Sequence, residues 1–286
     1  MGEGRSERTI LLDRINEIDK ISDQEWKAQL SERKVGELEF HDRDRDHSRI
    51  EKTVGEDTYE RYYGNRKYYM TTRRSSRFVK GWIGKNSRGK VFLDYACGSG
   101  ENAIAAARAG AALSLGFDIS AVSVKNAIRA ATDAGVKDNT RFFQADAENT
   151  RLPDNSIDLM VCSGMLHHLD LSYAFPEMRR ILRPGGKVLA VEALNYNPII
   201  RYYRLVTPDM RTQWEKTHIL DLSDVKFASR FFDAKEIRYW HVVGYASGRF
   251  PRLFKLLDRL DLVLETIPYV QRMAWIFTFV LEKRHE

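Results

Sequence analysis

A glycine-containing turn is the first place in this chain where main-chain atoms could do chemistry. An apolar run begins at Val91, the turn carries Gly98-Ser-Gly100, and an alanine-rich segment begins at Asn102. A strand that turns into a helix presents free backbone N–H groups and the positive end of the helix dipole to a ligand. Glycine has no Cβ, so a bulky ligand can approach closely. The turn therefore predicts a site for a ligand that carries negative charge.

Two acids follow later apolar runs, as the glycine turn follows the first one. Asp118 closes the second apolar run, about 20 residues after Gly98, where an acid can accept both hydroxyls of a ribose. Asp146 closes the third run, followed by Ala147, and suits the exocyclic amine of a base. The competing interpretation is that both acids only cap strand ends. The whole set favours a nucleoside with a charged tail. A dinucleotide is the competing ligand. The third glycine of its fingerprint is Ala103 here, which is tolerated, but the order of elements past the fifth strand differs from the dinucleotide-binding plan.

Three histidines are candidates for proton transfer. His167 and His168 follow the fourth apolar run, and His218 lies in a later aromatic segment. A histidine with a pKa of about 6.5 can take a proton at neutral pH, so all three are candidate catalytic bases. For each one singly, the favoured interpretation is that it shapes a pocket wall.

Metal chemistry is not expected at this site. No spacing typical of metal ligands occurs near the glycine turn or the strand ends. The run from His41 to Ser48 contains two histidines and three aspartates, but its alternating charges are typical of a solvated linker or helix face.

Alternating strands and helices must position these residues. From residue 90 the chain follows the rhythm of a parallel α/β sheet, whose ligands bind at the carboxyl ends of the strands. The pattern places a turn at Arg183-Pro-Gly-Gly186. We expect strands over residues 91–96, 113–119, 141–146, 157–165 and 187–193, and helices over residues 102–109, 121–134 and 173–182.

The rest of the chain is less regular. Helical spacing of apolar residues predicts one helix over residues 10–21 and a second around Trp26. Residues 195–235 look like an insertion that walls a site. Residues 250–267 carry a wide leucine stripe that we expect to be core, with a lipid-contacting face as the alternative. A strand near residues 237–245 and a final strand over residues 274–281 are expected to pair antiparallel.

Composition narrows the class of protein. The chain has 286 residues, is 43% hydrophobic and 30% charged, and carries a net charge of +6, values typical of a globular protein. Cys97 and Cys162 lie at strand ends, which favours reduced thiols over a disulfide. The polar N-terminus does not look like a signal peptide, and no apolar run reaches the roughly 18 residues of a membrane span. We therefore expect a cytoplasmic protein without a membrane span.

Five motifs in order resemble those of class I S-adenosylmethionine-dependent methyltransferases, in the branch that includes the ubiquinone and menaquinone enzymes. The resemblance covers residues 90–192 and is unspecific for substrate. Ala96 departs from the pattern, since the family usually has a glycine there, and alanine fits if its φ is negative. The motifs are Leu93-Asp-Tyr-Ala-Cys-Gly-Ser-Gly100, Gly116-Phe-Asp-Ile-Ser120, Gln144-Ala-Asp-Ala-Glu148, Leu152-Pro-Asp-Asn-Ser-Ile-Asp158 and Leu182-Arg-Pro-Gly-Gly-Lys187.

The resemblance implies a cofactor and a set of site residues. The cofactor is S-adenosylmethionine, with Asp118 on the ribose hydroxyls, Asp146 on the adenine amine, and Ser163 and Met165 near the sulfonium. The implied cofactor-binding residues are Asp94, Ala96, Cys97, Gly98, Gly100, Asp118, Ile119, Asp146, Ala147, Ser163, Met165 and Tyr69.

These inferences give one expected architecture. It is a Rossmann-like, seven-stranded, mostly parallel sheet with helices on both faces and an antiparallel last strand. Residues 86–286 form the methyltransferase domain, and residues 1–85 form a helical extension that acts as a lid and a homodimer contact. The aromatic and basic stretch over residues 59–77 has three interpretations, favoured in this order: packing on the main domain, a lid, and nucleic-acid binding.

The expected function is methylation of a small molecule with an apolar or aromatic body, at oxygen first and carbon second. Tyr202, Trp214 and the leucine-rich segment suggest that body. Two alternatives stay open. One is an RNA methyltransferase, although we do not expect a nucleic-acid partner. The other is a protein that binds the cofactor without transferring methyl, as a scaffold or a cyclising enzyme.

Overall fold

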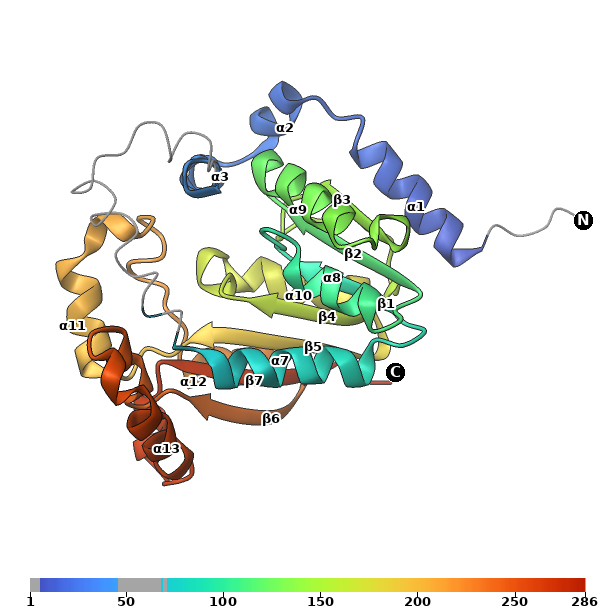
Figure 1. Ribbon diagram of the computed structural model, residues 1–286. Helices are drawn as coiled ribbons and strands as arrows, with labels where there is room; N and C mark the ends of the chain where they lie inside the picture. The colour runs from blue at the N-terminus through green and yellow to red at the C-terminus, as the bar shows by residue number, and fades with distance from the viewer. Residues whose placement is uncertain (1–5, 46–67, 69–70, 286) are drawn as a thin grey trace, which may run out of the picture.

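The fold is built on a single sheet of mixed direction. The structure is a computed structural model that describes residues 6–45, 68 and 71–285. In this part of the chain the strand order is β3-β2-β1-β4-β5-β7-β6, and β7 runs antiparallel to the other six (Figure 1). The expected fold class is confirmed. The strands are β1 (Val91–Tyr95), β2 (Leu113–Asp118), β3 (Thr140–Gln144), β4 (Ile157–Ser163), β5 (Leu182–Ala193), β6 (Asp233–Trp240) and β7 (Ile276–Glu282).

Helices cover both faces of the sheet, because the central strands β1, β2 and β4 are buried on both sides and need an apolar layer above and below. One face carries α7 (Arg73–Asn86), α8 (Glu101–Arg108) and α9 (Ala121–Asp133). The other face carries α1 (Glu7–Ile18), α10 (Leu171–Ile181) and α12 (Leu222–Ala228). These layers hold the strands firmly, so the residues at the carboxyl ends of the strands keep fixed positions.

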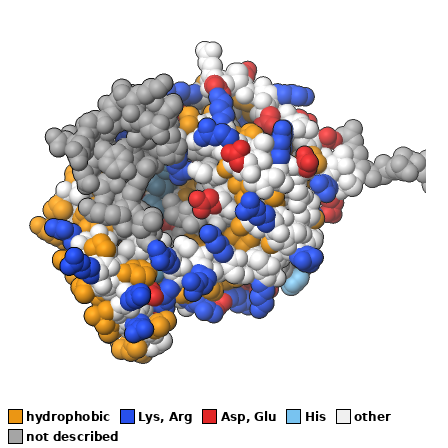
Figure 2. Space-filling model, viewed as in Figure 1, with side chains coloured by type: hydrophobic (Ala, Val, Ile, Leu, Met, Phe, Trp, Pro, Cys, Tyr) orange, Lys and Arg blue, Asp and Glu red, His pale blue; other side chains and the backbone are white. Residues whose placement is uncertain are grey.

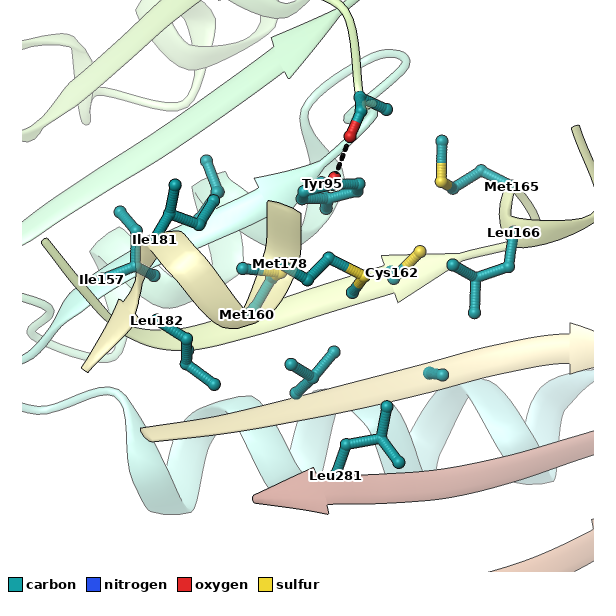
Figure 3. Close-up of a cluster of buried hydrophobic side chains, with 14 of the residues drawn as sticks. Tyr95, Ile157, Met160, Cys162, Met165, Leu166, Met178, Ile181, Leu182 and Leu281 are labelled. Atoms are coloured by element: carbon teal, nitrogen blue, oxygen red, sulfur yellow. Dashed lines mark hydrogen bonds between the residues drawn. The ribbon is translucent and has the colours of Figure 1, made fainter. Parts of the chain in front are cut away.

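The larger core cluster reaches directly beneath the strand ends that form the site. Tyr95 and Cys162 are fully buried in it, together with Met165 and Leu166 from the loop after β4 (Figure 3). The Tyr95 hydroxyl donates to the Ala147 carbonyl. A strand-end loop is thereby tied to the core of a neighbouring strand. Both cysteines are free and buried, as expected.

The N-terminal helices pack on the domain at one edge of the sheet. Leu11, Ile15 and Ile18 of α1 join the larger core cluster, and α2 (Asp23–Gln29) contributes the buried Trp26. Helix α3 (Glu32–Arg45) contacts α9 and extends along the carboxyl end of the sheet. The expected helix over residues 10–21 and the second helix at Trp26 are confirmed.

The chain after β4 departs from expectation at two places. The turn expected at Arg183–Gly186 is part of β5, as an irregularity in the pairing with β4 in which Gly185 has φ +73°. The leucine stripe was expected to be core, and this is wrong. In α13 (Phe254–Leu264) the side chains of Leu256, Leu260 and Val263 are exposed. Helix α11 (Pro198–Val206) lies within the irregular insertion.

No helix in the described residues is at once long enough and apolar enough to cross a membrane.

Candidate functional site

The glycine turn after β1 uses left-handed backbone at three positions. Ala96, Gly98 and Gly100 have φ values of +56°, +51° and +77°. The expectation of a negative φ at Ala96 is therefore wrong, and the alanine side chain occupies a conformation that glycine adopts at lower cost. The Cys97 N–H donates to the Phe117 carbonyl at 2.7 Å, which fixes the turn to β2.

Asp118 anchors this turn from below. Its two carboxylate oxygens accept the N–H groups of Gly98 at 2.9 Å and Ser120 at 3.0 Å. Burial raises the pKa of Asp118, and the nearby Arg45 guanidinium opposes that effect. A carboxylate oxygen has two lone pairs, so each oxygen keeps the capacity to accept a ligand hydroxyl.

Asp94 holds the other side of the turn. It is buried at the end of β1 and accepts hydrogen bonds from the Asn102 amide at 3.1 Å and the Ala103 N–H at 3.2 Å, at the start of α8. Burial raises its pKa to about 7, despite these hydrogen bonds. Burial also raises the pKa of the Cys97 thiol well above its usual value, which makes this cysteine a neutral lining residue.

Asp146 lies where expected, beside Ala147, and has a partner that the sequence did not suggest. Lys34 of α3 forms ion pairs with Asp146 at 2.6 Å and with Glu148 at 2.9 Å. The second oxygen of Asp146 accepts the Glu148 N–H at 2.9 Å. Burial lowers the pKa of Lys34, but the two carboxylates outweigh it and raise the pKa overall.

His167 forms a buried pair with an acid that sequence reasoning missed. Its Nδ1 lies 2.7 Å from a carboxylate oxygen of Glu192 in β5, whose other oxygen accepts the N–H groups of Met165 and Leu166. Burial lowers the pKa of His167, but the Glu192 charge and hydrogen bond raise it overall above its usual value. No hydrogen bond from the described residues reaches Nε2. This nitrogen is therefore suited to exchange a proton with a ligand.

His168 belongs to a second cluster with two residues of α3. Its Nδ1 lies 2.9 Å from Glu37, and His41 Nε2 lies 3.8 Å from the same Glu37 oxygen. Burial, together with the neighbouring His168 and Arg45, lowers the pKa of His41 well below its usual value. Nitrogen and oxygen atoms of the three residues lie within 4.8 Å of one another, an arrangement that could hold a divalent cation.

One expected site residue, His218, is not brought to this place. The exposed His218 stacks on Trp214, with ring centroids 3.6 Å apart, and does not line the cleft described below. Tyr69 lies outside the described residues, as do residues 59–67 and 70 of the aromatic and basic stretch, whereas residues 73–77 of that stretch form the first part of α7.

Gly100 packs against Phe142 and Ala127 and lines neither of two connected hollows, whereas the other expected site residues in the described part of the chain, apart from His218, line one or both of them. A pocket of about 80 Å³ is bounded by Asp118, Ile119, Asp146 and Ala147 on one side and by α3 on the other. A cleft of about 810 Å³ opens next to it, with Gly98 and His167 in its wall. Both hollows share a short set of lining residues, so one ligand could span them; these are His41, Arg45, Ala96, Ser163, Gly164 and His168.

The expected cofactor fits these residues. Asp118 retains acceptor capacity for hydroxyls and Asp146 is placed to accept from an amine. Gly98 lies in the wall of the cleft, its N–H is bound by Asp118, and the Arg45 guanidinium packs on the side where a Cβ would stand. The carboxyl group of an amino-acid end could pair with this guanidinium, so an adenosine group with a charged amino-acid end matches this combination of acids and cationic α3 residues.

Comparison with known proteins gives a family for the central part of the chain. Residues 93–190 match the family described as a methyltransferase domain. The 27-O-demethylrifamycin SV methyltransferase of Amycolatopsis mediterranei is 38% identical over 101 residues, 35% of this chain and 37% of that protein. A ubiquinone/menaquinone biosynthesis C-methyltransferase of Hahella chejuensis is 43% identical over 70 residues, 24% of this chain and 28% of that protein.

A solved structure extends the likeness to about three quarters of the chain. It is geranyl diphosphate C-methyltransferase from Streptomyces coelicolor, in complex with Mg²⁺, geranyl diphosphate and S-adenosyl-L-homocysteine. The TM-score is 0.53 at 14% identity, covering 74% of this chain and 77% of that one. At this identity the likeness shows the fold. The chain spans less than two-fifths of the length of the two curated relatives named above.

Proposed function

From the class I methyltransferase domain that residues 93–190 form, we propose that this chain methylates a small, partly apolar or aromatic molecule at a hydroxyl oxygen. The methyl donor is S-adenosylmethionine. The observation that carries the proposal is that His167, paired with Glu192, lies in the wall of the same cleft as the glycine turn. A cofactor site and a buried base within one cleft are what methylation of a hydroxyl requires.

In this proposal the acids of the strand ends hold the donor. Asp118 accepts the ribose hydroxyls, Asp146 accepts from the adenine amine, and Gly98 admits the amino-acid end. Helix α3 belongs to the N-terminal extension, for which we propose a lid role; it lines the proposed adenine pocket and contributes Lys34. When bound, the cofactor supplies a sulfonium methyl group that an acceptor atom can displace in line.

The His167–Glu192 pair prepares the acceptor. With the proton of neutral His167 on Nδ1 and donated to Glu192, Nε2 keeps its lone pair and takes the proton of the acceptor hydroxyl. Glu192 then stabilises the resulting imidazolium. Because Glu192 also accepts two backbone N–H groups of the loop after β4, it fixes the position of the base relative to Met165.

The shape of the cleft supports an apolar acceptor. Part of its wall is formed by Ile200, Tyr203, Tyr245, Trp275 and Ile276, while Arg204, Arg211 and Glu215 also line the cleft. Aromatic and aliphatic side chains together with a few charged groups are typical of sites for small organic ligands. The named relatives act at oxygen or at carbon according to their descriptions, so carbon is the second candidate atom.

The test is acceptor-dependent turnover of the whole chain. We would incubate it with methyl-labelled S-adenosylmethionine and a panel of phenols and enols with and without alkyl tails. The expected result is S-adenosylhomocysteine in equal amount to a labelled product whose methyl group is on oxygen. Labelled RNA in a parallel incubation would support the RNA alternative. Cofactor binding without any methylated product would support the non-transferring alternative.

A further inference from the structure

Helix α13 is packed with its polar side inward. Asp261 is fully buried and accepts the N–H groups of Val243 at 2.8 Å and Gly244 at 3.0 Å. Glu265, one residue past the helix, is hydrogen-bonded to the Arg74 guanidinium at 2.9 Å. The two acids of this helix therefore attach it to the protein, and its apolar side chains are left to face outward.

The outward side of this region is strongly apolar. Leu256 is 56% exposed, Val263 is 59% exposed and Tyr269 is 75% exposed. Single exposed apolar residues are ordinary on a protein surface, but a contiguous group of them marks an interaction site. The other exposed apolar residues of the segment are Phe250, Leu253, Leu260, Leu262, Ile267 and Met273.

Cations accompany these apolar side chains. Figure 2 shows apolar and basic side chains intermingled over the part of the molecule where α11 and α13 lie in Figure 1. Asp258 is the acid of the helix that is not buried, and it is only partly exposed. The exposed cations of the segment are Arg249, Arg252, Lys255, Arg259 and Arg272.

Helix α11 has the same outward character and also reaches the cleft. Tyr202 is 67% exposed and Leu205 is 78% exposed, with Val206 beside them also exposed. Ile200 and Tyr203 of the same helix line the cleft. We call the exposed apolar residues of α11 and of residues 249–273 the outer apolar surface.

We propose that the outer apolar surface docks this protein on the surface of an anionic lipid bilayer. An apolar helix face rimmed by arginine and lysine is suited to lie at the boundary of headgroups and acyl chains, where its cations meet acidic headgroups. A second copy of the chain is a poorer partner. A two-fold interface sets the same patch against itself, which would bring these cations close to their own copies. Docking also places α11, one wall of the cleft, at the lipid.

The test is binding of the whole chain to vesicles. One set contains phosphatidylcholine alone, and the other contains equal parts of phosphatidylcholine and phosphatidylglycerol. We expect co-sedimentation with the anionic set, at least tenfold weaker partitioning to the neutral set, and release by salt. The triple variant Leu256→Gln, Leu260→Gln, Val263→Gln should lose at least tenfold in partitioning to the anionic set.

A matched control variant tests whether vesicle binding depends on this surface or on any exposed apolar side chain. The triple variant Ile128→Gln, Tyr173→Gln, Ile237→Gln removes three exposed apolar side chains from other elements and should bind as the unaltered chain does. Circular dichroism of each variant verifies that it is folded.

The contribution of the cations to vesicle binding is tested with a second variant and its control. Replacing Arg252, Lys255 and Arg259 by glutamine should weaken binding to the anionic set at least tenfold. Replacing the exposed cations Lys85, Lys125 and Arg129 should change it less than twofold.

Three results would overturn the proposal. They are absence of binding to either vesicle set, an equal loss in the α13 variant and its control, and a stable dimer that the α13 variant dissociates. The last result would assign the outer apolar surface to a second copy. None of these measurements depends on methyl transfer, so the docking proposal and the proposed function can fail separately.

Discussion

Replacing Glu192 by glutamine changes the charge beside His167 and little else. The glutamine carbonyl can keep the hydrogen bonds from Met165 and Leu166, so its amide group faces the imidazole. An amide N–H donates, and His167 Nδ1 must then accept. The proton of neutral His167 is therefore moved to Nε2, the atom that we propose as the base.

The size of the effect follows from the 2.7 Å contact between His167 and Glu192. A hydrogen bond to a charged group contributes about 1.5–3 kcal/mol, and one pH unit corresponds to about 1.4 kcal/mol. The pKa of His167, which Glu192 raises above its usual value, should fall by about one to two pH units in the variant. With Nε2 protonated in the neutral ring, the maximal kcat should fall about 100-fold.

The assay is kcat against pH at saturating cofactor and acceptor. In the unaltered enzyme the base must be neutral, so kcat should rise with pH through an apparent pKa above about 6.5. In Glu192→Gln this rise should move to lower pH while the plateau drops. Glu215 is a weaker influence on His167, and Glu215→Gln should give a smaller displacement in the same direction. Cofactor affinity, measured by calorimetry, should stay unchanged in both variants.

A rise in kcat that stays at the same pH in Glu192→Gln would refute this reasoning, because the titrating group would not be His167. An unchanged plateau would mean that the enzyme works by positioning alone. If cofactor affinity falls as well, the loop after β4 has moved, and the result would report on structure instead of proton transfer.

Further predictions concern the turn, the donor site and the metal question. Asp118→Ala should weaken S-adenosylmethionine binding by about 1–3 kcal/mol in calorimetry, and an equal affinity would remove Asp118 from the ribose site. Ala96→Gly should raise the free energy of unfolding in urea by about 0.5–1 kcal/mol, because it relieves left-handed backbone; destabilisation would contradict that strain. His218→Ala should keep a near-normal kcat, since His218 does not line the cleft; a large loss would return it to the base candidates. Turnover should survive EDTA; a loss that Mg²⁺ or Zn²⁺ restores would indicate a metal ion at a group of residues able to hold one, such as Glu37, His41 and His168 or His167, His168 and Glu215.

The strand ends were predictable because they depend on local pattern. Apolar runs followed by an acid identify β2 and β3, and parallel strands bring such ends to one edge of the sheet. Asp118 and Asp146 consequently line one pocket, as expected. The burial of Glu192 and its need for a partner could have been inferred from the sequence, although they were not. An acid at the end of the apolar run Val188-Leu-Ala-Val-Glu192 must be buried, and a buried acid requires a partner.

Other contacts were not accessible from the sequence. Lys34 and Asp146 are 112 residues apart, and no local pattern links a lysine on a charged helix to a particular strand end. The direction of α13 was also misjudged. Its periodicity marks an apolar face, but which face turns inward depends on distant partners. The buried Asp261 binds backbone N–H groups of residues 243 and 244, and Glu265 binds Arg74 from α7.

The two sides of the cleft have different origins in the chain. The donor side, with Gly98, Asp118 and Asp146, lies within residues 93–190, the part shared with known methyltransferases. The opposite wall, with Tyr203 and Trp275, lies outside that part. A shared donor side explains how the curated relatives match over less than half of their length. It also means that similarity to them does not identify the acceptor molecule. In the proposed function that choice rests with α7, α11 and the chain entering β7, and α11 is the element that joins the cleft to the outer apolar surface.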